Sequence, residues 1–341
     1  MRILIAYFFD ERYIPLGYAI RDGFRRLGHE AFCFDTAQEH MLWRGLLKPV
    51  SSLKRRLSLP VGFERNGAFG REGYKRRLFF RQLAAVRPEI VVVLRAHQFL
   101  RPEDFRRARE EFGVRGIVGW NVEGPNVLFS LDSEARDYDA YFSMHLYGAH
   151  TAKVGRLPVW ATDERRYRRN VTLFAQRSPN PVLVSGWNPR RHQWAQALAE
   201  GRVSIYGRWS PRVREIPELL PFVRNEGCWG ERLCDLYNAS AVALNIQGWD
   251  PALDPCCNLR VADIPSCGSL FLSEYSEELA DIYRIGREAD SFRSPEEMLD
   301  KLRFYSRYPE VGARMAERGY RRACTLPSYK ERARTLIAHV R

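Results

Sequence analysis

The sequence has no long hydrophobic run, since its longest purely aliphatic stretch is IVVVL at residues 90–94. A helix that crosses a bilayer needs about 20 apolar residues. The first residues, MRILIAYFFDERY, also lack the small-residue cleavage site that follows the apolar core of a secretory signal peptide. We therefore expect a folded cytoplasmic protein without a membrane span.

Cysteines are present but follow no paired pattern: there are seven of them, at irregular spacing. Such spacing fits neither a disulfide framework nor the paired Cys and His ligands of a zinc site. A cysteine nucleophile would need a neighbouring base, and the sequence indicates none. We expect reduced thiols, no metal and no other cofactor.

Several nucleotide-binding signatures are missing. Neither half of the chain has Gly-x-Gly-x-x-Gly after its first strand, which argues against NAD or FAD, and no Walker Gly-Lys-Ser/Thr is present. Helix-turn-helix, RNA-recognition and zinc-finger patterns are also lacking. Sequence-specific binding of nucleic acid is therefore not expected.

Acidic residues are fewer than basic ones, 41 against 54, and the net charge is +13. A basic protein attracts anionic partners such as nucleic acid, an anionic membrane surface or phosphorylated small molecules. Residues 48–77 are the most basic segment, with nine basic residues, two acidic ones and interleaved apolar residues. We expect this segment to contact the inner membrane face or a phosphate-bearing acceptor. The alternative is a solvated loop.

Short apolar runs alternate with segments of helical spacing along most of the chain, which predicts parallel sheets covered by helices on both faces. The pattern restarts after SPNP at residues 178–181. We therefore predict two facing Rossmann-like, doubly wound α/β domains, at residues 1–168 and 181–325. Residues 37–73 read as an irregular basic insertion, and residues 189–198 as one helix.

The stretch CCNLRVADIPSCGSLFL, residues 256–272, predicts a helix that begins near Asn258 at the carboxyl end of a strand. Ligands of α/β proteins bind at that edge, and a helix N-terminus favours phosphate. Arg260 could make a two-point contact with a diphosphate, and Asp263 could accept hydrogen bonds from ribose hydroxyls. The alternative for Arg260 and Asp263 is an ion pair on the helix surface.

The segments LYNASAVALNIQ, NLRVADIPSCGSLFLSEY and FRSPEEMLDKLRFYSRYPEVGARMAERGYRRACTLPSYKERARTLI resemble the C-terminal half of GT-B glycosyltransferases, and most of all the bacterial CgeB-like, spore-maturation-protein-type group. The resemblance covers about residues 181–337. It is weaker in LRAHQFLRPEDFRRAREEFGVRGIVGWNVEGP, which contains a Trp-x-x-acidic-x-Pro turn. It implies GT-B architecture, with a C-terminal crossover helix in residues 326–341 that packs back on the N-terminal domain.

The same resemblance implies a nucleoside-diphosphate sugar donor on the C-terminal domain, an acceptor on the N-terminal domain, and no required metal. Asp263 stands where an acidic ribose ligand is usual, although that ligand is normally Glu. Pro255 occupies a position where the wider pattern often has a second Glu, so sugar contacts must come from elsewhere. The residues implied for nucleotide and diphosphate binding are Gly186, Arg190, Arg191, Tyr206, Asn258, Leu259, Arg260, Asp263 and Gly268.

Two further residues are candidate catalytic groups. Glu123 lies in the turn after a predicted strand and could deprotonate an acceptor hydroxyl, or it could be a turn or capping carboxylate. His145 ends another predicted strand at the mouth of the cleft, and the alternative for it is a structural histidine. The predicted function is metal-independent transfer of a sugar to a surface glycan, a lipid-linked glycan or a protein. Two alternatives stay open, a nucleotide-sugar epimerase of the same shape and a non-catalytic binder of nucleic acid or anionic membrane.

Overall fold

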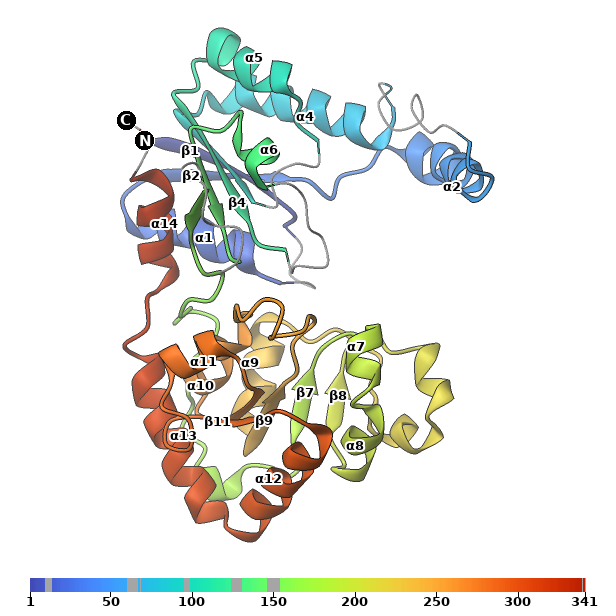
Figure 1. Cartoon of the computed structure of the whole chain (residues 1–341). Coiled ribbons are helices and arrows are strands. Elements are labelled where there is room, and N and C mark those ends of the chain that lie inside the picture. Colours follow the sequence, from blue (N-terminus) through green and yellow to red (C-terminus); the bar gives the residue numbers. More distant parts are fainter. Residues whose placement is uncertain are drawn as a thin grey trace.

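The computed structural model describes residues 1–9, 14–59, 67, 69–94, 99–123, 131–145, 154–338 and 340. Figure 1 shows two α/β domains, one above the other, which are joined by two crossings of the chain. Part of the Trp-x-x-acidic-x-Pro turn, residues 124 and 125, lies outside the described residues, as do residues 60–66 of the basic segment. Among the described helices, none combines the length and the apolar character that a bilayer span requires.

The N-terminal domain is built on a six-stranded parallel sheet in the order β2-β1-β3-β4-β5-β6. Its central strands form because β-branched and other apolar residues run together, as in β3, whose five residues are all buried. The strands are β1 (Arg2–Tyr7), β2 (Glu30–Asp35), β3 (Ile90–Leu94), β4 (Gly116–Asn121), β5 (Ala140–Ser143) and β6 (Val154–Arg156), and the helices are α1 (Leu16–Arg26), η1 (Trp43–Leu47), α2 (Lys48–Arg56), α4 (Arg71–Val86), α5 (Pro102–Phe112) and α6 (Leu131–Ala135).

The C-terminal domain repeats the design with a five-stranded parallel sheet in the order β11-β10-β9-β7-β8. Its strands are β7 (Val182–Val184), β8 (Ser204–Tyr206), β9 (Val242–Asn245), β10 (Leu270–Glu274) and β11 (Asp290–Phe292). Its helices are η3 (Phe174–Gln176), α7 (Pro189–His192), α8 (Ala195–Glu200), η4 (Arg212–Glu215), η5 (Pro217–Phe222), α9 (Gly230–Ala239), α10 (Arg260–Ser266), α11 (Glu277–Ile282), α12 (Pro295–Arg307) and α13 (Pro309–Ala323).

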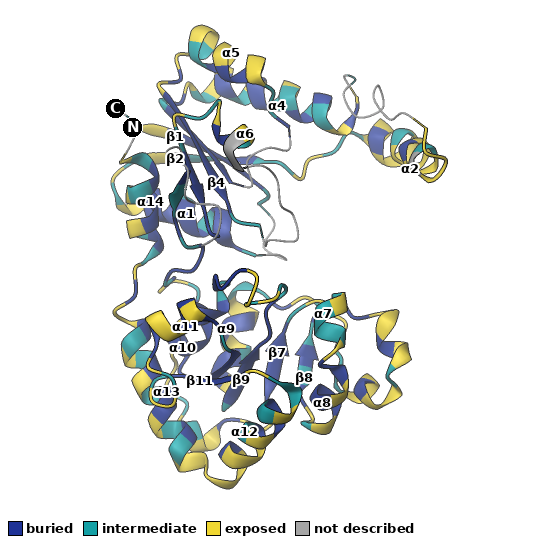
Figure 2. Ribbon diagram, in the orientation of Figure 1, coloured by how far each residue is buried: buried dark blue, intermediate teal, exposed yellow. Residues whose placement is uncertain are grey.

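Each sheet has a hydrophobic core on both of its faces. In the C-terminal domain, Leu183 faces one core while Val182 and Val184 face the other. In the N-terminal domain, Ile3 and Ile5 likewise alternate with Leu4 and Ala6. Figure 2 shows both sheets dark with buried residues beneath more exposed helices. Both sheets are wholly parallel, which confirms the prediction of two doubly wound domains.

The last helix, α14 (Tyr329–Ile337), leaves the C-terminal domain and packs against α1 of the N-terminal domain (Figure 1). Its residues Tyr329, Ala333 and Leu336 are buried in the same core as Phe24. The crossover helix expected from the resemblance is therefore present. Close packing against α1 depends on Gly23, where an added Cβ would lie 2.4 Å from the carbonyl oxygen of Tyr329.

Two expectations about local structure were wrong. Residues 41–56, expected to be irregular, form a continuous helical segment that includes η1 and α2. The single helix expected at residues 189–198 is instead two short helices, α7 and α8. The short strands β6 and β11 were not predicted, since three residues at the edge of a sheet give too little periodicity to detect.

Candidate functional site

A cavity of about 410 Å³ lies between the domains, at the carboxyl ends of strands from both sheets. This volume is within the range of small-molecule sites. The N-terminal domain contributes Tyr7, Phe8, Val122, Glu123 and Met144 to its wall, among others. The opposite wall includes Gly186, Arg191, Tyr206, Gly207, Trp229, Asn245, Asn258, Leu259 and Arg260. The site therefore has a mostly apolar N-terminal side and a cationic C-terminal side.

Asn258 holds the loop that carries the cationic wall. Its Nδ2 donates to Asn245 Oδ1 at 2.9 Å and to Gln247 Oε1 at 2.8 Å. Its Oδ1 accepts a hydrogen bond from Arg260 N at 2.9 Å, which satisfies one of the free amide groups at the start of α10. The predicted position of Asn258 at the start of this helix thus agrees with the structure, and its amide ties the loop to the end of β9.

Arg260 lies on the cavity wall and is only 8% exposed. Its Nη2 donates to Val184 O at 3.3 Å, and its guanidinium lies 4.6 Å from the centre of the Trp229 ring. Its Nη1 is 3.7 Å from Asp263 Oδ2, which is longer than a hydrogen bond. Its Nε is buried without a hydrogen-bond partner among the described residues. The guanidinium therefore has donor capacity left for a ligand.

Asp263 does not line the cavity and is 3% exposed. Burial raises the pKa of its carboxyl to about 8, in spite of the nearby positive charge of Arg260. At neutral pH the carboxyl is therefore largely protonated and cancels little of the charge of Arg260. Arg260 and Asp263 do form the ion pair of that alternative, three residues apart, but the pair is buried rather than on the helix surface. Because Asp263 is not part of the cavity wall, it is not placed to contact a ribose bound there.

Arg191 is the second cation of the cavity wall. Its Nε donates to Ile246 O and its Nη1 to Gly186 O, each at 3.0 Å. Burial, followed by the charges of Arg260 and Arg190, lowers its pKa to about 10, so it remains protonated at neutral pH. Among the described residues, it forms no ion pair with a carboxylate. Like Arg260, it brings an incompletely neutralised positive charge to the cavity.

Arg190 and Gly268, also predicted as donor-binding residues, lie elsewhere. Arg190 makes a two-point ion pair with Glu274 at the end of β10 and does not line the cavity. Gly268 lies just before β10, at the opposite end of that strand from the cavity, and has a φ of +75°. Its left-handed backbone ends α10, which explains the glycine without a ligand.

Glycines bring the backbone close to the cavity beside β7 and β8. Gly207 follows β8 with a φ of +155°, and an added Cβ would lie 2.1 Å from Ser185 O. Gly186 and Tyr206 also line the cavity, as predicted for residues near the donor. On the opposite wall, the Glu123 amide donates to Asn121 Oδ1 at 3.0 Å, which shapes the turn that carries Glu123 to the cavity.

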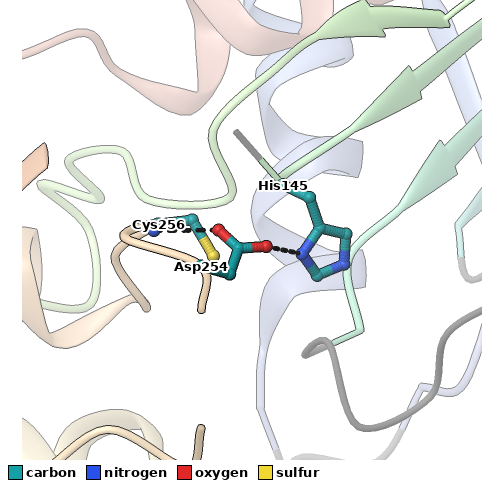
Figure 3. A group of neighbouring side chains, drawn as sticks. All are labelled: His145, Asp254 and Cys256. Atoms are coloured by element: carbon teal, nitrogen blue, oxygen red, sulfur yellow. Dashed lines mark hydrogen bonds and ion pairs between the residues drawn. The ribbon is translucent and has the colours of Figure 1, made fainter. Parts of the chain in front are cut away.

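His145 is 1% exposed and does not line the cavity, although its neighbour Met144 does. Its Nδ1 lies 2.6 Å from Asp254 Oδ2 of the C-terminal domain, and Asp254 Oδ1 accepts from Cys256 N at 3.1 Å (Figure 3). Burial opposes ionisation of Asp254, but these hydrogen bonds hold the pKa of its carboxyl below its ordinary value. The arrangement favours the structural alternative for His145, as a link between the domains.

The side chains of His145, Asp254 and Cys256 are near enough to one another to hold a metal ion (Figure 3). This group could not be found from the sequence, because His145 lies 109 residues before Asp254. Metal binding would need the Cys256 thiolate, yet burial and then Asp254 raise the pKa of that thiol. The Asp254 carboxylate is already bound by two donors. The chemistry of the group therefore fits a hydrogen-bonded link better than a metal centre.

Two residues that line the cavity, Trp229 and Asn245, were also not predicted from the sequence. Neither was a second link between the domains. Arg156 Nη2 donates to Glu278 Oε1 at 2.5 Å, and the other oxygen of Glu278 accepts from Cys257 N. Nothing in the local sequence marks such a pair, because its partners are 122 residues apart. Only the assembled fold brings them together.

Comparisons with known proteins agree with this geometry. The structure of HepE from Anabaena in complex with UDP-glucose is similar over 99% of this chain and 98% of that one, with 10% identity and a TM-score of 0.66. Sucrose-phosphate synthase from Thermosynechococcus elongatus is similar over 98% of this chain and 96% of that one, with 10% identity and a TM-score of 0.64. An alpha-glucosyltransferase in complex with UDP and DNA is similar over 98% of this chain and 99% of that one, with 12% identity and a TM-score of 0.64. The fold is GT-B.

The GT-B architecture predicted from the sequence is thus confirmed. Residues 190–338 match the family described as "Glycosyl transferase-like". The C-terminal part of the chain is therefore similar to a glycosyl transferase-like domain, and the prediction of a glycosyltransferase is confirmed at that level. A comparison with curated proteins gave no match.

Proposed function

We propose that the protein transfers a sugar from a nucleoside-diphosphate sugar to a hydroxyl group of an acceptor. The observation that carries this proposal is the pair of guanidinium groups, Arg191 and Arg260, on the C-terminal wall of the interdomain cavity. Neither charge is fully neutralised by a carboxylate of the described residues. A leaving diphosphate would meet both charges in a largely buried site, where electrostatic stabilisation is strongest.

The donor assignment is supported by the relatives of the fold. HepE was solved with UDP-glucose and the alpha-glucosyltransferase with UDP. We infer that this chain also takes a nucleoside-diphosphate sugar, and UDP is the first nucleotide to test. In this proposal Tyr206, Trp229 and the glycines beside β7 and β8 surround the nucleotide, and Asn258 and Leu259 shape its loop. Asp263 packs beside the Arg260 guanidinium behind the cavity wall and helps to fix its position.

We further propose that the transfer needs no metal and no other cofactor, because two arginines supply the charge that a cation would otherwise provide. Glu123 faces the cavity from the N-terminal domain and is the candidate base for an acceptor hydroxyl, if the reaction inverts the anomeric centre. His145 is proposed to act indirectly, by holding the domains together. These roles divide the site into a cationic donor side and an acceptor side.

The acceptor is proposed to be a hydroxyl of a bacterial surface glycan, a lipid-linked glycan or a protein, as the resemblance to the CgeB-like group implies. We place the reaction in the cytoplasm. The seven cysteines are free thiols, which is usual for proteins of a reducing compartment.

Titration calorimetry with UDP tests the donor site. Arg191→Ala and Arg260→Ala should each weaken binding by at least about tenfold, since a charge-assisted hydrogen bond contributes about 1.5–3 kcal/mol. The matched control is Arg106→Ala, at an exposed arginine of α5 far from the cavity. Wild-type affinity in folded Arg191→Ala and Arg260→Ala protein would remove both residues from the donor site.

Product analysis separates the proposed transfer from its main alternative. With UDP-sugar and acceptor, a transferase forms a glycosidic product and releases UDP, whereas an epimerase converts the UDP-sugar alone. Activity lost on addition of EDTA and restored by Mg²⁺ or Mn²⁺ would contradict the metal-independent mechanism.

A further inference from the structure

A helical arm projects from the N-terminal domain beyond the end of α4 (Figure 1). We define the arm as residues 41–59, of which residues 41–56 are helical and include η1 and α2. It contains five basic residues, Arg44, Lys48, Lys54, Arg55 and Arg56, and no acidic residue. Apart from η1, no element in the described part of the chain packs extensively against α2.

One face of the arm is less exposed than the rest. Trp43 and Ser51 are buried, and Leu47 and Lys54 are partly buried, at a spacing of three or four residues. Pro49 lacks an amide hydrogen and would disturb a regular helix at this point. The wider π-helical turn at residues 43–47 precedes Pro49 and lets the helix continue.

A second face carries apolar side chains exposed to solvent. Leu42, Leu46, Val50, Leu53 and Leu57 follow the helical spacing of four, four, three and four residues. Their exposed fractions are 47%, 61%, 38%, 58% and 60%. Seven of the fifteen exposed large hydrophobic residues in the described chain lie in the arm, from Met41 to Leu59. Such a concentration on one element marks an interaction surface, and Figure 2 shows how little of the arm is buried.

The charge of the arm selects the partner. A second copy of the chain, docked arm to arm, would bring two groups of five positive charges together with no acidic residue of the arm to offset them. An anionic lipid surface complements the same charges and accepts the apolar stripe into its interface. A helix of this size, basic and amphipathic, cannot cross the bilayer but can lie in its surface.

We propose that residues 41–59 anchor the protein to an anionic membrane surface, with the stripe Leu42, Leu46, Val50, Leu53 and Leu57 inserted at the lipid interface. Binding itself requires no catalysis. Its use, to bring the donor site to lipid-linked acceptors, rests on the proposed function. The two can fail separately, because vesicle binding and UDP affinity are measured independently.

The experiment is sedimentation of the full-length protein with vesicles of phosphatidylcholine containing about one third phosphatidylglycerol, compared with pure phosphatidylcholine. The wild type should bind the anionic vesicles and lose most of that binding in high salt. Leu46→Ser with Leu53→Ser should reduce the partition coefficient at least about tenfold, because two apolar side chains no longer insert. Lys48→Glu with Arg56→Glu should do the same at low salt.

Matched controls lie outside the arm. Val171→Ser with Leu173→Ser removes two side chains that are 98% and 65% exposed, and Arg106→Glu with Arg287→Glu reverses two exposed charges. Both control proteins should bind vesicles as the wild type does, and all variants should keep the UDP affinity of the wild type. Wild-type sedimentation no greater with anionic than with neutral vesicles would overturn the proposal. So would a concentration-dependent dimer that the Leu46→Ser, Leu53→Ser variant abolishes, because the stripe would then be covered by a second copy.

Discussion

At the scale of single residues, Asp263 shows how burial changes the meaning of a carboxyl group. A carboxylate beside Arg260 would ordinarily neutralise it, but burial raises the pKa of Asp263 to about 8. The position that the resemblance assigns to a ribose ligand is therefore occupied by a largely protonated group behind the cavity wall. Asp263 therefore offsets little of the positive charge that Arg260 brings to the cavity.

The same residue should make stability depend on pH. Its folded pKa lies above its unfolded value of about 3.9, so from about pH 4 to pH 8 the folded state holds a proton that the unfolded state lacks. The unfolding free energy should therefore fall as pH rises through this window, by up to about 1.4 kcal/mol per pH unit. Asp263→Asn should remove this slope and stabilise the protein relative to wild type at pH 8. Urea unfolding at pH values from about 5 to about 8.5 measures the slope.

The control for this measurement is Asp300→Asn, at a carboxylate whose side chain is 75% exposed. It should leave the pH dependence of the wild type unchanged. If the wild type and Asp263→Asn proteins lose stability in parallel as pH rises, the carboxyl group of Asp263 is ionised in the folded protein at neutral pH.

Single residues also mark the limit of what the sequence could predict about the site. Asn258 and Arg260 were placed correctly because the signals that start a helix are local. Which of Arg190 and Arg191 lines the cavity could not be predicted locally. Arg190 is held by Glu274, which lies 84 residues away in the sequence. His145 was taken as a candidate for the cleft, but its environment is set by Asp254 across the domain boundary.

At the scale of helices and strands, the packing of α14 on α1 depends on one position without a side chain. An added Cβ at Gly23 would lie 2.4 Å from Tyr329 O and 3.2 Å from the Cβ of Ala333. Gly23→Ala should therefore force the two helices apart and destabilise the protein by about 1–3 kcal/mol. Thermal unfolding measures this loss, while UDP affinity should stay within about twofold, because α14 lies outside the cavity wall.

Gly45→Ala provides the comparison, because no atom lies within 4 Å of its added Cβ. This change should leave the melting temperature unchanged or raise it slightly, since alanine favours helix over glycine by about 0.5–1 kcal/mol. Equal melting temperatures for Gly23→Ala and wild type would show that α14 can shift without cost.

Most elements were predictable because their apolar spacing is regular and their ends carry clear signals, whereas the crossover helix α14 was implied by the resemblance. β3 is an unbroken apolar run, and α5 begins with Pro102 in its first turn. The helical arm was not predicted because Gly45 and Pro49 interrupt its pattern, and because a π-helical turn changes the period of that pattern. Its apolar stripe also resembles a core-facing helix, although nothing in the described chain covers it extensively.

At the scale of the whole molecule, the two domains meet through polar links and through apolar packing, since Cys256, Trp249 and Leu259 pack in the core of the N-terminal domain. The links His145–Asp254 and Arg156–Glu278 join the domains close to the loop that carries Asn258 and Arg260. The chain itself crosses twice at one place, where Thr162 N donates to Pro327 O at 2.9 Å. The side-chain links hold the domains in the arrangement seen here, and we expect any opening to occur about the double crossing.

Arg156→Met should therefore slow sugar transfer by at least about fivefold while the dissociation constant for UDP changes less than about threefold, because the donor side lies on one domain. It should also lower stability by about 1–3 kcal/mol, since the buried Glu278 loses its cation. Steady-state kinetics, calorimetry and thermal unfolding give the three values.

Arg26→Met is the matched comparison, because Arg26 pairs with Glu164 at 3.2 Å through side chains that are 40% and 70% exposed. Such surface pairs contribute about 0–1 kcal/mol, and neither rate nor affinity should change. If Arg156→Met behaved like Arg26→Met in all three measurements, the link between Arg156 and Glu278 would have no part in domain closure.

Because α14 completes the core of the first domain, the second domain is topologically an insertion into the first. Residues 169–326 form one continuous stretch that can be excised as a gene fragment, whereas the first domain needs segments from both sides of that stretch. A fragment that stops at residue 168 would leave the surface of α1 beneath Tyr329, Ala333 and Leu336 uncovered. To study the two halves separately, residues 169–326 should therefore be replaced with a short linker, rather than the chain cut once.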